Sequence, residues 1–216
     1  KILYTIYIGM TLIQIILLLI GKIPLFDTLC IAFGTAGTGG FGIVNDSMGS
    51  YSTYCQIITT IFMILFGVNF SAYYLILTKK FVQAFKFEEV RYYFGIILAS
   101  VLIIGLNTAH LFRNLGEAFQ QAAFQVGSII TTTGFSSTDF NQWPSLSKTI
   151  LVLLMFVGAC AGSTGGGIKV SRILILCKAA KKEFQLYLHP NAIKKIKMDE
   201  KTIGHDILRS TNIYLS

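Results

Sequence analysis

Long apolar runs separated by short polar stretches dominate the pattern of this sequence. Residues 2–20, 55–77 and 92–111 are long enough to cross a bilayer, because about 30 Å of hydrocarbon requires roughly 20 mostly apolar helical residues. A fourth run stops short at residues 149–160 and resumes at residues 168–177. The pattern therefore predicts an all-α membrane protein whose fourth span is broken.

Two of the stretches between the spans resemble each other. Residues 24–50 read PLFDTLCIAFGTAGTGGFGIVNDSMGS, and residues 116–145 read GEAFQQAAFQVGSIITTTGFSSTDFNQWPS. Aligning Gly40 with Gly134 also aligns the phenylalanine that follows each. Each stretch contains a segment of about a dozen residues, too short to cross a bilayer, as expected of a re-entrant helix. The sequence therefore predicts a unit of span, re-entrant pore helix, glycine segment and span that is used twice.

This repeat divides the chain into four parts. We expect a first pore repeat at residues 1–78 and a cytoplasmic link at residues 79–91. We expect a second pore repeat with a broken last span at residues 92–188, and a cytoplasmic segment leading to a further repeat at residues 189–216.

Composition and charge agree with a membrane location. The chain is 53% hydrophobic and 13% charged, whereas soluble domains carry about 25% charged residues. Basic residues gather at residues 79–91 and from Lys169 to the end, and basic flanks favour the cytoplasmic side. Residues 21–53 and 112–148 should then face outward. We do not expect a nucleic-acid partner, although a basic tail is compatible with one, because the tail directly follows a span.

The two glycine segments are candidates for an ion path. Irregular backbone is not stable in lipid, because its polar groups would be unsatisfied, but it is tolerated where it lines water or ions. Backbone carbonyls replace the hydration shell of a cation when the chain adopts unusual dihedrals, which glycine permits. A pair of tight surface turns would not explain two matched copies. The candidate cation-coordinating residues are Thr38, Gly39, Gly40, Phe41, Thr132, Thr133, Gly134 and Phe135.

Two acidic residues follow the glycine segments at similar distances. Asp46 and Asp139 lie six and five residues after the aligned glycines, Gly40 and Gly134. In an outer mouth they would raise the local concentration of cations. They are equally compatible with solvated turns.

The interruption of the fourth span is rich in glycine and small polar residues. Each of its three successive glycines, residues 165–167, costs roughly 1 kcal/mol in helix propensity relative to alanine. We interpret the segment as a gate on the inner side of the second glycine segment, with a helix kink as the alternative. Lys169 is either a gate charge or an inside-facing anchor. The candidate gate residues are Ala161, Gly162, Ser163, Thr164, Gly165, Gly166, Gly167 and Lys169.

Enzyme motifs are not convincing in this sequence. Residues 37–42 match G-x-G-x-x-G but lack the flanking strand, helix and acidic residue of a dinucleotide site. Residues 162–169 lack the Gly-Lys-[Ser/Thr] of a phosphate loop. The expected spans carry no acidic residue for a proton relay. We therefore expect no enzyme and no organic cofactor, and we interpret the four cysteines as packing residues: Cys30, Cys55, Cys160 and Cys177.

Several segments together resemble a known family. The chain is similar over essentially its whole length to the TrkH type of the Trk/Ktr/HKT superfamily of potassium transporters. The segments that carry the resemblance are TAGTGGFG at residues 35–42, TTTGFSSTDFNQWP at 131–144, GACAGSTGGGIKVSRILIL at 158–176 and HPNAIKKIK at 189–197.

The resemblance implies an architecture larger than this chain. Family members have four such repeats around one pore in one polypeptide, and this chain looks like the second and third. Since it begins with Lys1 and supplies only half a ring, we expect it to be a piece of a longer protein, with two copies making a four-fold pore as the alternative. Residues 38–41 and 132–135 match the family's selectivity filter, and residues 161–169 match its intramembrane gate loop.

The resemblance also implies an activity and partners. We expect uptake of potassium, the transported ion, through a gated, channel-like pore in the cell (plasma or inner) membrane. Potassium symport coupled to Na⁺ or H⁺ is the alternative. The expected partners are the lipid bilayer, the remaining pore repeats, a second copy in a homodimer, and a cytoplasmic nucleotide-binding ring of the TrkA type. The Thr-Gly-Gly-Phe of the first filter departs from the Thr-Thr-Gly-Phe of the second, which weakens the expectation of strict potassium selectivity.

Overall fold

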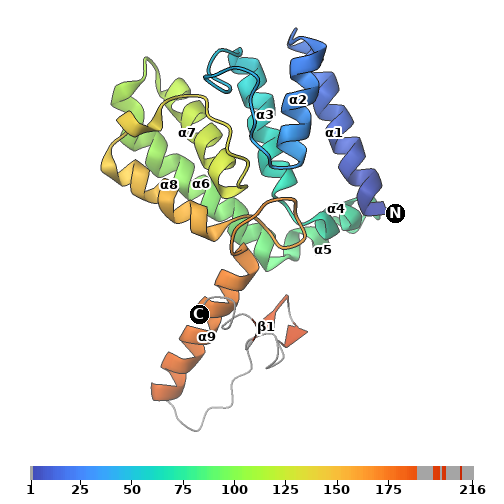
Figure 1. Ribbon diagram of the computed structural model, residues 1–216. Helices are drawn as coiled ribbons and strands as arrows, with labels where there is room; N and C mark the ends of the chain where they lie inside the picture. Colours follow the sequence, from blue (N-terminus) through green and yellow to red (C-terminus); the bar gives the residue numbers. More distant parts are fainter. Residues whose placement is uncertain (1, 189–196, 200, 203–209, 211–216) are drawn as a thin grey trace.

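The computed structural model shows two helical repeats beside each other (Figure 1). It describes residues 2–188, 197–199, 201–202 and 210. Most of the segment at residues 189–216, including the HPNAIKKI stretch, therefore lies outside the described residues. Within that segment, β1 (Lys197–Met198) pairs antiparallel with β2 (Lys201–Thr202).

The first repeat consists of a long helix, a shorter re-entrant helix and a returning helix. They are α1 (Ile2–Ile20), α2 (Leu25–Ala36) and α3 (Thr53–Phe66). Pro24 immediately precedes α2, where its fixed φ and missing N–H are tolerated. The three helices contact one another around a small core that includes Leu18, Ile31 and Met63. This arrangement places the end of α2 at the first glycine segment.

The expectation of one continuous span at residues 55–77 was wrong. Helix α3 ends at Phe66, and α4 (Phe70–Leu77) follows after a bend of 93°. Asn69 begins the new helix by accepting a hydrogen bond from the Ser71 N–H at 2.8 Å. The carbonyl of Gly67, freed at the break, accepts a hydrogen bond from the Cys160 N–H at 3.0 Å. The break is therefore stabilised by backbone that is distant in sequence, which local apolarity does not reveal.

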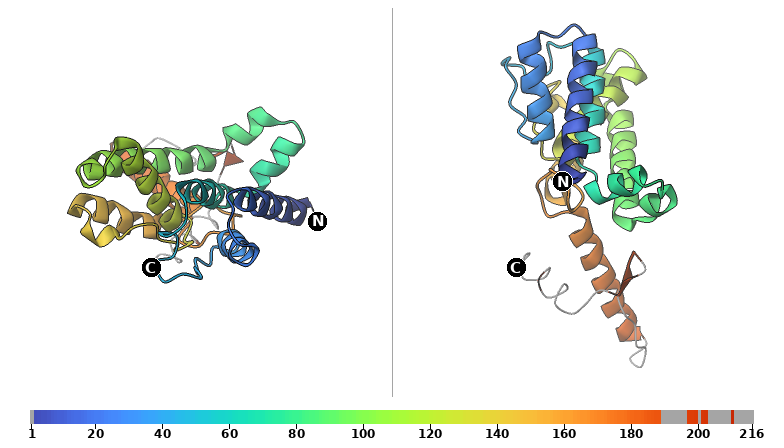
Figure 2. Two further views of the ribbon diagram at one scale, coloured as in Figure 1. Left: turned by 90° about the horizontal axis from the view of Figure 1, so that it is seen from above. Right: turned by 90° about the vertical axis from the view of Figure 1, so that its right-hand side faces the viewer.

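The second repeat follows the same order after a short link. The link contains α5 (Phe81–Lys86). The helices that follow it are α6 (Glu88–Thr108), η1 (Ala109–Leu111), α7 (Leu115–Ile130), η2 (Phe140–Gln142), α8 (Ser145–Val157) and α9 (Val170–Leu188). Helices α8 and α9 are separated by residues 158–169, the stretch that contains the expected break. Figure 2 shows α9 projecting from the helical body, at the end opposite the turn that joins α1 to α2.

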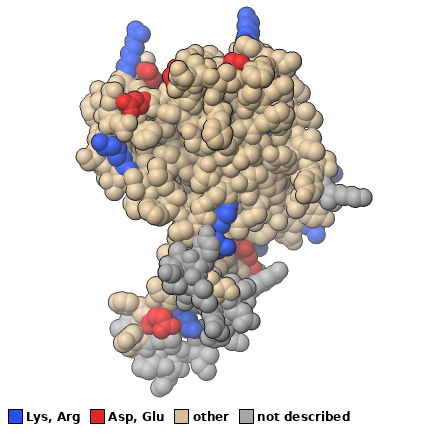
Figure 3. Space-filling model, in the orientation of Figure 1, with Lys and Arg blue, Asp and Glu red and all other residues tan. Residues whose placement is uncertain are grey.

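Apolar helices and the placement of charge agree with a membrane protein. Ile2–Ile20 and Glu88–Leu111 are each long and apolar enough to cross a membrane, and the bent pair of α3 and α4 is a third such stretch if counted as one. Large apolar side chains such as Ile8, Ile16 and Phe156 are exposed on the outside of the helices. Figure 3 shows charged side chains mainly towards the upper and lower ends of one face and few across its broad middle.

Candidate functional site

The two glycine segments lie in direct contact. A Cβ atom added to Gly40 would be only 1.9 Å from the carbonyl oxygen of Thr133 and 2.9 Å from the carbonyl carbon of Gly134. Only glycine permits this approach. Two segments that are distant in sequence are thereby brought together between their pore helices.

The backbones of the two segments have matching conformations. Positive φ angles occur at Thr38 (52°) and Gly40 (66°), and again at the aligned positions Thr132 (57°) and Gly134 (90°). Left-handed backbone at a threonine is uncommon, so its presence at both aligned positions indicates a specific arrangement. The alignment of the two stretches in sequence is therefore also an alignment in backbone conformation.

The end of each pore helix binds its glycine segment in the same way. The carbonyl of Gly34 accepts hydrogen bonds from the N–H groups of residues 39 and 40, at 2.7 and 3.4 Å. The aligned carbonyl of Ser128 accepts hydrogen bonds from the N–H groups of residues 133 and 134, at 2.9 and 3.3 Å. The N–H groups are thus turned towards the pore helix in both repeats.

Most carbonyl groups of the two segments have no hydrogen-bond donor. Within the described part of the chain, no N–H or O–H group donates to the carbonyls of residues 38–41 or 132–134. The carbonyl of Phe135 differs, because it accepts a hydrogen bond from the buried Ser128 hydroxyl at 2.6 Å. Backbone carbonyls at membrane depth are costly unless something satisfies them. These seven oxygens therefore have no hydrogen-bond donor among the described residues.

The aligned phenylalanines have different environments. The side chain of Phe135 is 1% exposed and lies against α2 of the first repeat, where a Cβ on Gly34 would be 3.0 Å from its Cζ. The side chain of Phe41 is 84% exposed. The ring of the second repeat thus fills a site on the repeat before it, and the ring of the first repeat has no such neighbour among the described residues.

The C-terminal end of the second glycine segment is held by the loop of the first repeat. The N–H of Ser136 donates to the hydroxyl of Ser47 at 3.2 Å, and the carbonyl of Ser136 accepts from the Met48 N–H at 2.8 Å. In the same loop, the hydroxyl of Tyr51 donates to Asp27 at 2.8 Å. Burial, together with this bond to a carboxylate, raises the pKa of Tyr51 to about 12.

Asp46 and Asp139 both lie exposed in the turns after the glycine segments. Asp46 accepts a hydrogen bond from the Ser50 hydroxyl. Asp139 accepts one from the N–H of Asn141 at 3.0 Å, which lowers the pKa of its carboxyl group. Both are therefore local turn acids, and their placement is also compatible with attraction of cations.

Sequence reasoning missed a group of glutamines behind the glycine segments. The side-chain oxygen of Gln56 accepts hydrogen bonds from the amides of Gln120 (2.8 Å) and Gln121 (3.2 Å). Its amide nitrogen donates to the carbonyls of Met48 (2.9 Å) and Tyr51 (3.2 Å). Gln56 on α3 thus joins the loop before α3 to the pore helix of the second repeat. In the sequence, the only sign of this group was one polar residue, Gln56, on the face of the helix that lies beside the pore helix.

The loop between α8 and α9 lies against Thr38 and Thr132, the aligned threonines of the two glycine segments. The hydroxyl of Thr38 donates to the carbonyl of Thr164 at 3.3 Å. The hydroxyl of Thr132 accepts from the N–H of Gly166 at 2.6 Å. A Cβ on Gly166 would be 2.9 Å from that hydroxyl oxygen, so the loop approaches this closely only because the position is glycine.

The same loop crosses over itself at two glycines. Gly158 and Gly167 have φ angles of 72° and 80°, and a Cβ on Gly167 would lie 2.6 Å from the Cα of Gly158. The crossing is closed by a hydrogen bond from the Val170 N–H to the Ala159 carbonyl at 3.1 Å. Residues 158–169 thus form an irregular loop, which is more than the simple helix kink that the sequence left open. Lys169 follows the crossing, and its ammonium group donates to the Gly165 carbonyl.

One acidic residue beside this loop contradicts an expectation from the sequence. We expected no acidic residue in the spans, but α6 begins at Glu88 and not at residue 92. Glu89 is 4% exposed and accepts a hydrogen bond from the Ala161 N–H at 2.5 Å. The third span therefore contributes a buried carboxylate to the environment of the loop.

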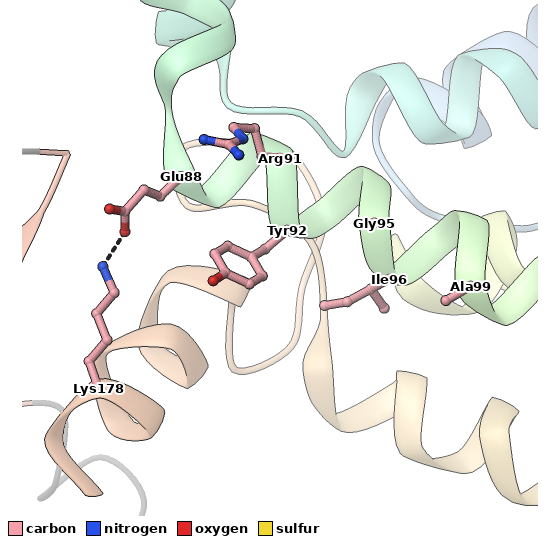
Figure 4. A pocket seen from close by; sticks show the side chains of 7 residues that line it. All are labelled: Glu88, Arg91, Tyr92, Gly95, Ile96, Ala99 and Lys178. Carbon is pink, nitrogen blue, oxygen red and sulfur yellow. Dashed lines mark hydrogen bonds and ion pairs between the residues drawn. The ribbon is translucent and has the colours of Figure 1, made fainter. Parts of the chain in front are cut away.

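A cavity of about 580 Å³ lies between α6 and α9, away from the glycine segments (Figure 4). Its charged lining includes an ion pair between Glu88 and Lys178. The remaining lining residues are Arg91, Tyr92, Gly95, Ile96 and Ala99.

Comparison with known proteins gives consistent similarities. The family model TrkH, described as a cation transport protein, matches residues 1–212. The chain is 33% identical over 216 residues to the Trk system potassium uptake protein TrkH of Salmonella typhimurium, covering 97% of this chain and 44% of that protein. It is 30% identical to the Trk system potassium uptake protein TrkG of Escherichia coli, covering 87% of this chain and 39% of that protein.

A solved structure has the same fold. The crystal structure of the potassium transporter TrkH from Vibrio parahaemolyticus matches with a TM-score of 0.93 and 31% identity, covering 100% of this chain and 47% of that one. The chain thus spans less than half the length of these relatives. The similarities confirm the predicted fold class, an all-α membrane protein of repeated pore units, and a multi-pass location in the cell membrane.

Proposed function

Because the chain belongs to the TrkH family of cation transport proteins, we propose that its two glycine segments supply half of a potassium-conducting selectivity filter. The relatives are named potassium uptake proteins, and this chain covers 44% of the first of them. The activity proposed is that of a longer protein, in which potassium is the transported ion. Uptake follows the electrochemical gradient through a pore.

The observation that carries the proposal is the set of seven carbonyl groups without a donor. They belong to two segments of matching backbone that touch each other at Gly40 and Thr133. In a filter, such oxygens replace the hydration shell of the ion. The N–H groups turned towards Gly34 and Ser128 keep the opposite side of each segment bound to its pore helix. This division of donors and acceptors is what a cation pathway requires.

The two phenylalanines support further pore repeats in the complete protein. Phe135 packs against the preceding repeat, so we infer that Phe41 packs against another repeat that comes before this chain. If each phenylalanine packs against the repeat before it, the end of α7 near Ser128 would contact the phenylalanine of a repeat that follows. Four repeats would then close one ring.

The loop at residues 158–169 is the proposed gate. It lies directly against Thr38 and Thr132, the innermost residues of the two filter segments, and is hydrogen-bonded to both. An ion that leaves the filter on this side has to pass it. The bonds to the two threonines would have to break for the loop to move aside.

The inner side of the protein is the proposed contact surface for its regulator. Helix α9 projects from the helical body (Figure 2) and carries Lys178, Lys181 and Lys182. A basic helix of this kind fits a cytoplasmic nucleotide-binding ring of the TrkA type. A homodimer in the membrane completes the proposed assembly.

Coupled symport is the second candidate, and Glu89 is the observation that favours it. A buried carboxylate beside an ion path is a feature of proton- and sodium-coupled carriers. The Glu89 carboxylate instead accepts hydrogen bonds from backbone N–H groups, which is a structural role. We therefore rank uncoupled uptake above coupled symport. Rubidium uptake that requires a proton or sodium gradient would reverse this order.

Rubidium uptake into vesicles that carry the full-length protein, with sodium as competitor, tests the proposed function. We expect Gly134→Asp to lower uptake or its selectivity over sodium, because aspartate adds a side chain and a charge at a position with a φ of 90°. Exposed Asp139→Asn is the control and should retain selectivity. Wild-type selectivity in Gly134→Asp would contradict the filter assignment.

A further inference from the structure

Glu89 is a buried carboxylate that the proposed ion path does not use. It lies in the first turn of α6 and is 4% exposed. Its Oε1 atom accepts hydrogen bonds from the N–H of Ala161 at 2.5 Å and from the N–H of Ser171 at 3.2 Å. Ala161 belongs to the loop, and Ser171 belongs to the first turn of α9. One oxygen atom therefore binds the main chain on both sides of the glycine run at residues 165–167.

The chemistry of these hydrogen bonds favours strong binding of the main chain by Glu89. Hydrogen bonds from backbone N–H groups to a carboxylate are charge-assisted and stronger than neutral ones. The Ser171 N–H is one of the donors that every helix leaves unpaired in its first turn, so Glu89 caps α9 from another helix. The positive ends of the α6 and α9 dipoles both lie beside this carboxylate and favour its charge.

The loop is bound on two sides. Thr38 and Thr132 bind it from the filter, and Glu89 binds it where it joins α9. We propose that Glu89 is a positioning residue that holds the loop beneath the filter by binding the main chain at Ala161 and Ser171. The inference rests on the proposed gating role of the loop and adds the residue that keeps it closed.

The neighbouring acid provides a matched control. Glu88 occupies the same turn of α6, but its carboxylate points to α9 and pairs with Lys178, as Figure 4 shows. Within the described part of the chain, its side chain makes no hydrogen bond to residues 158–169. Replacing Glu88 or Glu89 removes the same charge from the same helix end, and only one replacement removes the bonds to the loop.

Cys160 is a native reporter of the loop position. It precedes Ala161, and its side chain is fully buried, at 0% exposed. In the full-length protein with every other cysteine replaced by alanine, the rate at which a soluble methanethiosulfonate reagent modifies Cys160 measures how often the loop leaves its site. Rubidium flux through vesicles of the same variants measures conduction.

We expect Glu89→Ala to raise the rate of Cys160 modification at least tenfold and to raise rubidium flux without the regulator. Glu89→Gln keeps an accepting oxygen in place but loses the charge, so both changes should be clearly smaller than in Glu89→Ala. Glu88→Ala should remain within threefold of the unmodified Glu89 protein in both assays. This pattern separates positioning of the loop from a general effect of charge or stability.

The outcomes separate this inference from the proposed function. Unchanged Cys160 reactivity in folded Glu89→Ala would overturn the role of Glu89 and leave the gate itself intact. Raised reactivity with unchanged flux would support the hold by Glu89 and contradict the gating role of the loop. If Glu89→Ala does not fold, Glu89→Asp decides, because its side chain is one methylene shorter and cannot reach both N–H groups. Unchanged Cys160 reactivity in that variant would likewise overturn the inference.

Discussion

Replacing Gly40 with alanine should disturb the proposed filter through a single methyl group. The added Cβ would lie 1.9 Å from the Thr133 carbonyl oxygen, whereas real Cβ atoms essentially never approach closer than 3.0 Å. The two segments would have to separate by about 1 Å, a large change for a ring of oxygens that replaces a hydration shell. Left-handed backbone at this position also costs roughly 1–2 kcal/mol when the residue is alanine.

Gly134→Ala separates these two effects. Its φ of 90° imposes a comparable backbone cost, but no atom lies within 4 Å of the added Cβ. In vesicles that carry the full-length protein, we expect Gly40→Ala to reduce discrimination between rubidium and sodium at least tenfold, or about 1.4 kcal/mol. Gly134→Ala should reduce this discrimination less than Gly40→Ala does. Equal, wild-type discrimination in both variants would refute the close contact of the two segments in a working filter.

Two further predictions concern the proposed gate and the proposed further repeats. Deleting residues 164–166 should raise rubidium flux measured in the absence of the regulator, because it removes the hydrogen bonds to Thr38 and Thr132; unchanged flux would contradict the gate. In the full-length protein, Phe41→Ala should lower stability about as much as Phe135→Ala, roughly 3 kcal/mol for a buried phenylalanine, although Phe41 is 84% exposed in this chain. Thermal unfolding in detergent measures both, and a neutral Phe41→Ala beside a costly Phe135→Ala would show that Phe41 has no neighbour.

Local signals in the sequence were sufficient to predict the repeat and the interruption between α8 and α9. Glycines and small polar residues inside apolar runs are strong local signals, so the segments around Gly40 and Gly134 and the loop before Lys169 were found where the structure has them. The positive φ angles of Gly40 and Gly134 are typical of glycine, whereas those of Thr38 and Thr132 do not follow from the residue type. Their roles in conduction stay proposals.

Features that depend on distant contacts were not predictable in the same way. The bend after Phe66 lies in an apolar run, and it is stabilised by the bond from Cys160 to Gly67. Glu89 lies just before the apolar run that marked the third span, and only the fold places it against Ala161. Phe41 and Phe135 follow the aligned glycines and differ in burial only because of what lies beside them. Each case requires tertiary information that composition and periodicity lack.

Anomalous X-ray diffraction from crystals of the full-length protein grown with thallium or rubidium would locate the transported ion directly. We predict anomalous density on the shared axis, coordinated by carbonyl groups of residues 38–41 and 132–134. Density confined to other parts of the protein, with these carbonyls bound to protein donors, would contradict the proposal that main-chain oxygens here coordinate potassium.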